Sequence, residues 1–216
     1  MSGPSSVFAL LDGIRALPVV AIDAVEDAVP LADALVQGGL PAIEVTLRTP
    51  AAFDAIAKLQ KERPNLLIGA GTVISGAQMK TCAALGVRFA ISPGLTPALL
   101  EIAHELNMPY LPGTATASDV MTGLQHGWRE FKFFPAEAAG GPAMLKSWAG
   151  PFPDVQFCPT GGITAQNVGL YTALPNVVMV GSSSMLPAMA LKTKDWPEIA
   201  RRSRAFADAV DNITSC

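Results

Sequence analysis

Short apolar segments of strand type recur along the chain at intervals of roughly 20–25 residues, and a segment of helical type follows each of them. The strand-like segments span residues 17–23, 42–48, 66–73, 89–93, 110–114, 130–135, 156–160 and 177–181. The segments between them are rich in alanine and leucine, as in 24–37, 50–61, 76–85 and 97–106. Strands that alternate with helices predict a parallel sheet joined by right-handed crossovers.

Eight such units favour closure of the sheet. The expected fold class is therefore α/β, a (β/α)8 TIM barrel with an additional N-terminal helix over residues 5–16 and a trailing helix over 196–210. The 216 residues suffice for one large core and no linker divides them, so residues 1–216 are expected to form a single domain. The alternative is an open doubly wound sheet, but Gly69-Ala-Gly71 lacks the spacing of a dinucleotide fingerprint.

Composition argues against two classes of partner. Half of the residues are hydrophobic, 15% are charged and the net charge is −3. The longest basic cluster is Arg201-Arg202, which gives no electrostatic case for binding nucleic acid. No apolar run approaches the ~20 residues that span a bilayer, and the first residues do not have the form of a signal peptide. We expect neither a nucleic-acid nor a membrane partner.

The cysteines and histidines do not form a recognisable metal motif. Cys82, Cys158 and Cys216 are scattered, odd in number and without metal or redox spacing, which favours a reduced, cytoplasmic location. His104 and His126 lie far apart in helix-like segments. The sequence therefore predicts no metal site.

One lysine lies in an otherwise aromatic and uncharged strand-like segment, Phe131-Lys132-Phe133-Phe134. Burying an ammonium group is costly because desolvation disfavours its charged form, and a free amine is a nucleophile that can form a Schiff base with a carbonyl. Strand alternation sends Lys132 and Phe134 inward and sends Phe131 and Phe133 toward the helices. The alternative is a lysine that extends its charge to the rim of the strand.

Other polar side chains lie near the carboxyl ends of the strand-like segments, where the functional groups of such folds gather. In the second segment, alternation puts Glu44, Thr46 and Arg48 on one face, and Thr72 and Thr160 end two later segments. We expect a carboxylate, a guanidinium and two hydroxyls to converge with the lysine amine at the carboxyl end of the predicted barrel. The alternatives are a structural ion pair between Glu44 and Arg48 and threonines that only bond a loop.

Two glycine-rich segments, 160–164 and 181–184, follow the seventh and eighth strand-like segments. Glycines let backbone N–H groups approach an anion closely, and Ser182, Ser183 and Ser184 add hydroxyl donors. Loops at these two positions hold a phosphate in many barrels, and amide dipoles can meet its charge without a nearby lysine. The two loops together predict a phosphate site.

Five motifs together resemble one known family. They are Glu44-Val-Thr-Leu-Arg48-Thr, Gly69-Ala-Gly-Thr72-Val, Ile91-Ser-Pro93-Gly, Phe131-Lys132-Phe-Phe134-Pro-Ala-Glu137 and Cys158-Pro-Thr160-Gly-Gly-Ile163. From residue 11 to residue 186 the chain resembles the bacterial 2-keto-3-deoxy-6-phosphogluconate (KDPG) aldolases, class I aldolases of the Entner–Doudoroff pathway. The resemblance implies a homotrimer of (β/α)8 barrels that needs no metal and no cofactor. It also implies cleavage of KDPG to pyruvate and glyceraldehyde 3-phosphate, with 4-hydroxy-2-oxoglutarate as a second substrate.

The resemblance implies a role at each matching position. Lys132 would be the Schiff-base lysine and Glu44 the carboxylate that shuttles protons. The implied substrate contacts are Arg48 and Thr72 on the pyruvate carboxylate, Pro93 and Phe134 beside the pyruvyl group, and Thr160 near the substrate hydroxyl and carbonyl. The implied phosphate contacts are Gly161, Gly162 and Ser183, to which we add Gly181 and Ser182 of the same loop.

The chain departs from the family pattern at two places. Gly181-Ser182-Ser183-Ser184-Met185 stands where the familiar pattern is Gly-Gly-Ser-Trp-Leu, which leaves Ser182 or Ser184 open as an additional or substitute phosphate ligand. Ala21 stands where proline is common, a change of little expected effect. The functional alternatives are an aldolase specific for the galactonate epimer or for 4-hydroxy-2-oxoglutarate alone, a phosphate-binding barrel without lyase activity, and a barrel isomerase or phosphate-ester synthase.

Overall fold

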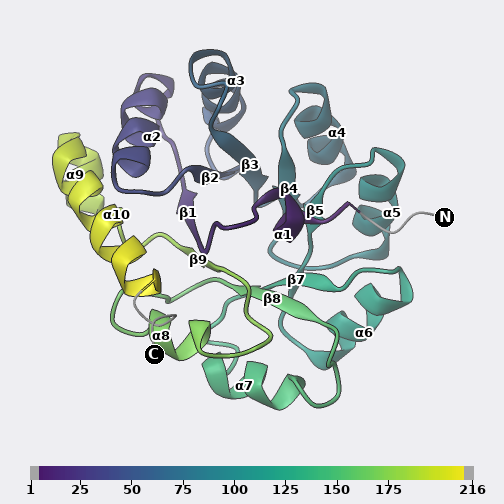
Figure 1. Cartoon of the computed structure of the whole chain (residues 1–216). Coiled ribbons are helices and arrows are strands. Elements are labelled where there is room, and N and C mark those ends of the chain that lie inside the picture. The colour runs from purple at the N-terminus through teal and green to yellow at the C-terminus, as the bar shows by residue number, and fades with distance from the viewer. Residues whose placement is uncertain (1–4, 212–216) are drawn as a thin grey trace.

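The computed structural model describes residues 5–211, and in it the strands form the centre of the molecule while helices surround them (Figure 1). The strands are β1 (Ala16–Val20), β2 (Ala42–Thr46), β3 (Leu67–Gly71), β4 (Phe89–Ile91), β5 (Tyr110–Leu111), β6 (Gly113–Thr114), β7 (Glu130–Phe133), β8 (Gln156–Pro159) and β9 (Val180–Ser182). All the ladders between them are parallel. The predicted alternation of strand and helix is confirmed.

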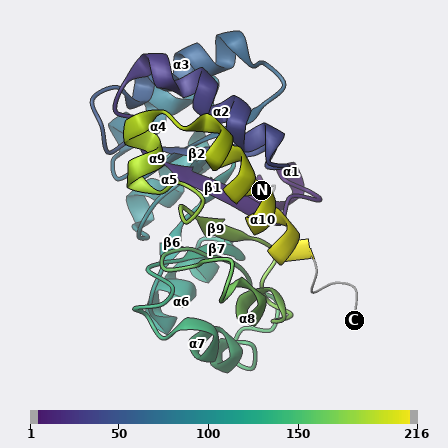
Figure 2. The ribbon, with the colours of Figure 1, turned by 90° about the vertical axis from the view of Figure 1, so that its left-hand side faces the viewer.

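The helices cover the outer faces of the strands, except α1, which contacts the amino end of β7. They are α1 (Val7–Leu10), the 3-10 helix η1 (Val25–Asp27), α2 (Ala28–Gln37), α3 (Ala52–Glu62), α4 (Gly76–Ala84), α5 (Pro97–Glu105), α6 (Ala117–Gln125), α7 (Gly141–Trp148), α8 (Val168–Thr172), α9 (Ala188–Thr193) and α10 (Trp196–Asp211). Figure 2 shows α6, α7 and α8 beside β6 and β7, with α2 and α3 at the opposite end of the molecule. The trailing helix predicted over 196–210 is confirmed as α10. Within residues 5–211 no helix is both long and apolar enough to cross a membrane.

The prediction of a closed eight-stranded (β/α)8 barrel is wrong. Among residues 5–211 the strands form two separate parallel sheets. One has six strands in the order β5-β4-β3-β2-β1-β9, and the other has three in the order β6-β7-β8. The sheets are therefore broken at two places, and each break has a local cause.

The first break lies within residues 110–114, which the sequence predicts as one strand. β5 pairs with β4, whereas β6 pairs with β7, and Pro112 lies between β5 and β6. Proline has no N–H to give to a ladder, so pairing cannot continue through it on both sides. Its carbonyl accepts the N–H of Lys132 at 2.9 Å, so the chain passes from the first sheet to the second at this residue.

The second break lies between β8 and β9. In the described chain only two isolated bridges join these segments, Phe157 with Val177 and Thr160 with Gly181. The bridges lie three residues apart on one side (160 − 157) and four on the other (181 − 177), so the register slips by one residue. A slip of this kind is a bulge, and it interrupts the ladder.

The N-terminal helix is shorter than predicted. α1 ends at Leu10, and Gly13, with a φ of +77°, helps turn the chain toward β1. Glu130, the first residue of β7, accepts the N–H groups of Val7 at 2.9 Å and Phe8 at 3.1 Å. This carboxylate ties α1 to the amino end of β7, where Val7 and Phe8 join an apolar cluster with residues of β1, β4 and β8.

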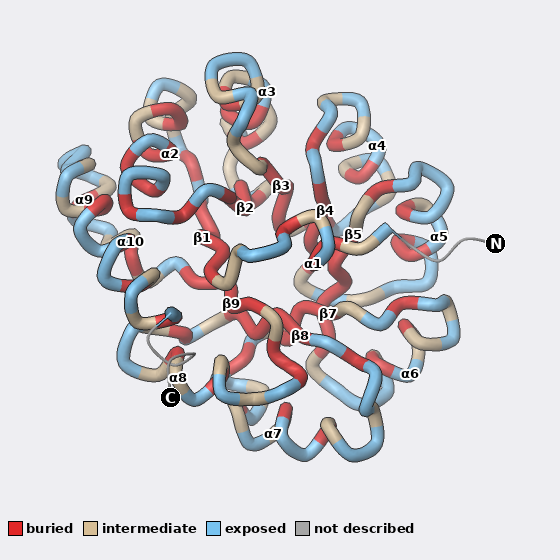
Figure 3. Tube along the Cα trace, viewed as in Figure 1, coloured by how far each residue is buried: buried red, intermediate tan, exposed pale blue. Residues whose placement is uncertain are grey.

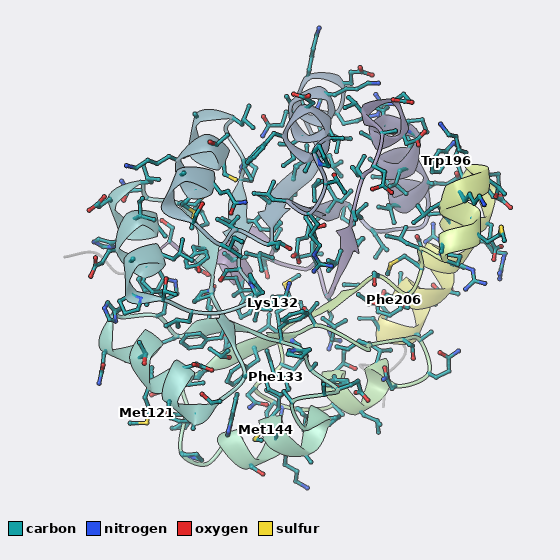
Figure 4. The ribbon with its side chains drawn as sticks, turned by 180° about the vertical axis from the view of Figure 1, so that it is seen from behind. Met121, Lys132, Phe133, Met144, Trp196 and Phe206 are labelled. Atoms are coloured by element: carbon teal, nitrogen blue, oxygen red, sulfur yellow. The ribbon has the colours of Figure 1, made fainter. Side chains whose placement is uncertain are left out.

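The two faces of β7 meet different surroundings, as strand alternation predicts. The Phe133 ring lies 5.3 Å from the Trp148 ring of α7, and Phe131 lies 6.2 Å from Phe157. Lys132 lies near the centre of the molecule, and Phe133 lies on the side of α7 (Figure 4). Buried residues follow the strands and the inner sides of the helices (Figure 3). The aromatic residues of β7 thus belong to the outer core, and the lysine points to the opposite side.

Phe133→Ala should lower the free energy of unfolding by about 3–5 kcal/mol, because it removes a fully buried ring and leaves a cavity against Trp148. Urea unfolding followed by circular dichroism measures the loss. Phe134→Ala is the matched control, since its ring is only partly buried and lies on the other face. Equal losses for the two variants would contradict the assigned parity.

Candidate active site

The central feature of the site is an ion pair between Lys132 on β7 and Glu44 on β2. The Lys132 Nζ lies 3.0 Å from Glu44 Oε1 and 3.4 Å from Oε2. The side chains are 4% and 1% exposed, so both charges are removed from water. Removing one partner of such a pair is far more costly than removing both, because an uncompensated charge remains buried. The pair holds an amine and a carboxylate within the reach of a proton transfer.

Glycine in the neighbouring strand makes room for this carboxylate. A Cβ atom at Gly71 of β3 would lie 2.2 Å from Glu44 Oε1, a distance that no side chain can adopt. The Lys132 ammonium also lies 5.2 Å from the centroid of the Phe134 ring. The small residue that the sequence places before Thr72 is therefore a packing requirement of the ion pair.

Cys158 is the register partner of Lys132 on β8 and is fully buried. Burial raises the pKa of the Cys158 thiol to about 12, while the charge of Lys132 acts in the opposite direction. The thiolate, not the thiol, is the nucleophile of cysteine chemistry. Cys158 therefore stays protonated at neutral pH and does not compete with the amine. Cys82 is also free and buried, and Cys216 lies outside the described residues.

Arg48 and Thr72 meet at the carboxyl ends of β2 and β3. The Arg48 Nε donates to Thr72 Oγ1 at 3.1 Å, and Thr72 has a left-handed φ of +57°. The alternative of a structural ion pair between Arg48 and Glu44 does not hold, because the carboxylate pairs with Lys132 and no ion pair within residues 5–211 includes Arg48. The Arg48 guanidinium is exposed.

A cavity of 460 Å³ opens beside the ion pair at the carboxyl ends of the strands. The predicted site residues that line it are Arg48, Phe134, Thr160, Gly161, Gly162, Ser182 and Ser183. The predicted site residues outside its lining are Lys132, Glu44, Thr72, Pro93 and Gly181. Of these, Thr72 contacts Arg48, and the backbone of Pro93 lies against Gly113, which is the β6 partner of Lys132.

The two glycine-rich segments meet across this cavity. Gly161 and Gly162 have φ values of +105° and +80°, and Ser183 is exposed. Ser182 is 2% exposed, and its hydroxyl donates to the Ile163 carbonyl at 2.7 Å. Gly181 lies in β9, where a Cβ would stand 2.3 Å from Thr160 Oγ1. The predicted loops therefore come together, although Ser182 and Gly181 are engaged with other parts of the protein.

Sequence reasoning missed Asn167, which supports the first glycine-rich segment from the end of the same loop. Its Nδ2 donates to the Gly162 carbonyl at 3.0 Å, and its Oδ1 accepts the Thr164 N–H at 2.8 Å. The available signal was an asparagine just before a helical segment, a position that favours side-chain bonds to the backbone. Among residues 5–211 no cluster of three or more His, Cys, Asp or Glu side chains is arranged to hold a metal ion.

A buried amine beside a carboxylate, next to a cavity with a guanidinium and glycine amides, defines the class of site at which an enzyme forms a Schiff base with an anionic carbonyl compound. The family model of the KDPG and KHG aldolases matches residues 7–202. The chain belongs to this aldolase family, so it is a carbon–carbon lyase, and the resemblance drawn from the motifs is confirmed.

Individual relatives are similar over most of their length. The 2-dehydro-3-deoxy-phosphogluconate aldolase of Pseudomonas aeruginosa is 48% identical over 190 residues, which cover 88% of this chain and 86% of that protein. The KHG/KDPG aldolase of Escherichia coli is 48% identical over 188 residues, covering 87% and 88%. A KDPG aldolase from Legionella pneumophila, solved with pyruvate captured at low pH as a covalent carbinolamine intermediate, superposes with a TM-score of 0.89. It is 47% identical and covers 92% of this chain and 96% of its own.

Proposed function

We propose that this protein cleaves 2-keto-3-deoxy-6-phosphogluconate to pyruvate and glyceraldehyde 3-phosphate through a Schiff base on Lys132. The observation that carries the proposal is the buried pair of Lys132 Nζ and Glu44 Oε1, 3.0 Å apart. An amine held inside the protein beside a proton acceptor combines the nucleophile and the general base that this chemistry requires. The nearby cavity supplies a place for an anionic substrate.

In the first half of the reaction, the Lys132 ammonium gives a proton to Glu44, and the free amine adds to the C2 carbonyl carbon and forms a carbinolamine. Glu44 returns this proton to the hydroxyl group of the carbinolamine, water leaves, and a protonated imine remains. Glu44 then takes the proton of the C4 hydroxyl, directly or through one water, and the C3–C4 bond breaks. Its electron pair moves into the imine and produces an enamine of pyruvate, while C4 becomes the aldehyde carbon of glyceraldehyde 3-phosphate.

In the second half, protonated Glu44 returns its proton to the enamine carbon and restores the imine. Addition of water to the imine carbon releases pyruvate and regenerates the Lys132 ammonium beside the Glu44 carboxylate. The water lost during imine formation is thus taken up again, and the reaction needs no external acid or base beyond this pair. The short distance between the two groups supports one carboxylate acting in both proton transfers.

The remaining predicted residues would bind and orient the substrate. Arg48 suits a bidentate grip on the pyruvate carboxylate, and its bond to Thr72 holds the guanidinium in place. Pro93 and Phe134 would form the walls beside the pyruvyl group, and Thr160 would contact the substrate hydroxyl and carbonyl. The phosphate would lie against Gly161, Gly162 and Ser183, with Gly181 and Ser182 behind them. Binding at the phosphate end orients the reacting bond at the other end.

Ser183→Ala should raise the KM for the phosphorylated substrate about tenfold, because a hydrogen bond to a charged group contributes roughly 1.5–3 kcal/mol. The KM for 4-hydroxy-2-oxoglutarate, which carries no phosphate, should stay nearly unchanged. Steady-state kinetics on both substrates tests this expectation, with the exposed Ser147→Ala on α7 as the control. Equal losses on the two substrates would argue against a phosphate contact.

The choice of substrate is tested by comparing kcat/KM for KDPG, its C4 epimer of the galactonate series and 4-hydroxy-2-oxoglutarate. We expect KDPG to be preferred and 4-hydroxy-2-oxoglutarate to be cleaved more slowly. A preference for the epimer, or turnover of 4-hydroxy-2-oxoglutarate alone, would overturn the proposed specificity. The alternatives without aldolase activity, namely a phosphate-binding protein or an isomerase, give no role to a buried lysine on β7 that is paired with a carboxylate on β2.

We further propose a homotrimer in the cytoplasm. The trimer rests on the family resemblance, and the 63% exposed Ile74 after β3 offers an apolar side chain that a neighbouring copy could cover. The location rests on the free thiols of Cys82 and Cys158. Light scattering coupled to gel filtration should give three times the mass of one chain, and a single-chain mass would contradict the trimer.

A further inference from the structure

Four consecutive carbonyl groups of the first glycine-rich segment are held by hydrogen bonds. The Thr160 carbonyl accepts the Ala136 N–H at 2.8 Å, and the Gly161 carbonyl accepts the Glu137 N–H at 3.1 Å. The next two are held by side chains. Asn167 Nδ2 donates to the Gly162 carbonyl at 3.0 Å, and Ser182 Oγ donates to the Ile163 carbonyl at 2.7 Å. Two of these four carbonyl groups are therefore held by backbone N–H groups and two by side chains.

The N–H groups of the same segment differ from its carbonyl groups, because most of them are not hydrogen-bonded. Within residues 5–211 the N–H groups of Gly161, Gly162 and Ile163 make no hydrogen bond of normal geometry, and all three residues line the cavity. The next N–H, that of Thr164, is accepted by Asn167 Oδ1. Unpaired backbone N–H groups at a cavity wall are donors available to an anion.

Planarity of the peptide links these two observations. The carbonyl of one residue and the N–H of the next lie in one plane and point in opposite directions. A bond that holds the Gly162 carbonyl therefore also fixes the N–H of Ile163. In the following peptide both ends are held, the Ile163 carbonyl by Ser182 and the Thr164 N–H by Asn167. Glycine can adopt many backbone conformations, so without these bonds Gly161 and Gly162 would not be restricted to their left-handed φ values.

We propose that Asn167 and Ser182 are positioning residues of the phosphate site. They hold the carbonyl side of the loop so that the amides of Gly161, Gly162 and Ile163 stay presented to the substrate phosphate. This rests on the proposed function, because it assigns the phosphate end of that same substrate to these amides. In this proposal Ser182 supports the loop and does not donate to the phosphate. Its single hydroxyl proton has an acceptor in the Ile163 carbonyl, and its oxygen accepts the Ser184 N–H at 3.1 Å.

Ser182 can be tested by two different substitutions. Glycine at this position cannot form a side-chain bond between the two loops. Ser182→Gly therefore removes the bond and adds backbone freedom. Ser182→Ala and Asn167→Ala remove the same kind of bond without adding backbone freedom.

The test compares Asn167→Ala, Ser182→Ala and Ser182→Gly with the parent protein on KDPG and on 4-hydroxy-2-oxoglutarate. We expect the KM for KDPG and the inhibition constant of inorganic phosphate to rise about 5- to 30-fold for Asn167→Ala, as for the loss of one or two hydrogen bonds. For the Ser182 variants the KM for KDPG and the inhibition constant of inorganic phosphate should rise about 3- to 10-fold. The kcat for KDPG and both constants for the unphosphorylated substrate should change less than about twofold.

Asn176→Ala is the matched control, because Asn176 is a buried asparagine whose Nδ2 donates to the Leu145 carbonyl at 2.9 Å, away from this loop. It should lower stability without raising the inhibition constant of phosphate. If Asn167→Ala does not fold, the milder Ser182 variants still decide the matter. Losses that fall equally on both substrates, or an unchanged inhibition constant, would overturn the positioning role.

Amide resonances separate positioning from direct contact and from failure of the proposed function. Inorganic phosphate added to the parent protein should shift the Gly161, Gly162 and Ile163 amide signals, and the shifts should be smaller at equal phosphate in Asn167→Ala and Ser182→Ala. If phosphate shifts none of these three signals, the positioning proposal fails even when KDPG is cleaved. If the three signals respond as expected while KDPG is not turned over, the proposed substrate is wrong, but the assignment of phosphate to the amides of the first glycine-rich segment holds.

Discussion

Replacement of Lys132 by alanine should abolish aldol cleavage, with a loss of turnover on the order of 10⁴–10⁶-fold, as when a covalent nucleophile is removed from an active site. The same change should abolish the trapping of pyruvate by borohydride. The physical reason is that only an imine can be reduced to a stable secondary amine, and the proposed mechanism assigns that imine to the buried Lys132 amine. Mass spectrometry of the intact protein and of its peptides measures both the gain in mass and its location.

Two further variants make the Lys132 result decisive. Lys132→Ala leaves Glu44 buried without its cation, which can cost about 3–5 kcal/mol of stability. Lys132→Met together with Glu44→Gln removes both charges and preserves the packing, so loss of trapping in this folded variant cannot be attributed to unfolding. Lys146→Ala on α7 changes an exposed lysine and should trap pyruvate like the parent. A pyruvate adduct on the Lys132→Ala protein would show that another residue is the nucleophile.

Glu44→Gln should separate imine formation from proton transfer. The glutamine occupies the same volume but cannot take a proton, so pyruvate should still be trapped on Lys132 by borohydride. Exchange of the pyruvate methyl protons with deuterium should slow by about 10²–10⁴-fold, the usual contribution of a positioned general base. Proton NMR of pyruvate in deuterated buffer follows the exchange directly.

The control for this prediction is Glu101→Gln on α5, where the carboxylate is exposed and has no contact with the site. Its exchange rate should equal that of the parent. Since pyruvate carries no phosphate, the measurement is independent of the glycine-rich loops. An unchanged exchange rate in a folded Glu44→Gln protein would exclude Glu44 as the proton carrier.

Strand alternation predicted the environment of β7 from four residues. A lysine between phenylalanines at odd positions had to lie on the opposite face from them, and the structure has Phe133 against Trp148 while Lys132 meets Glu44. Alternation was sufficient here because the direction of a side chain along a strand depends only on local backbone geometry. The same reasoning put Glu44 and Arg48 on one face.

Closure of the sheet could not be predicted in the same way. Pro112 was visible in the sequence, but whether it ends a strand or lies at an unpaired edge depends on what is beside it. The slip of one residue between the bridges at Val177 and Gly181 leaves no trace in the spacing of apolar residues. Both breaks concern lateral pairing, which joins residues far apart in the chain.

The roles of Asn167 and Ser182 lie between these cases. Glycines and serines after two strands indicated an anion site, yet the sequence did not say which groups face the cavity and which hold the loop. Ser182 was predicted as a phosphate contact because hydroxyls bind phosphates, whereas in the structure its proton has an acceptor in Ile163. The direction of one hydroxyl depends on a carbonyl 19 residues away.

The sequence by itself determined the alternation of strands and helices, the inward direction of Lys132 and the family to which the chain belongs. These follow from local periodicity and from residue types in order, which the sequence contains in full. Tertiary structure alone decided that the Glu44 carboxylate pairs with Lys132 and not with Arg48, that the strands form two sheets, and that Asn167 holds the first glycine-rich segment. Those outcomes depend on distances across strands and loops, and such distances exist only after the chain has packed.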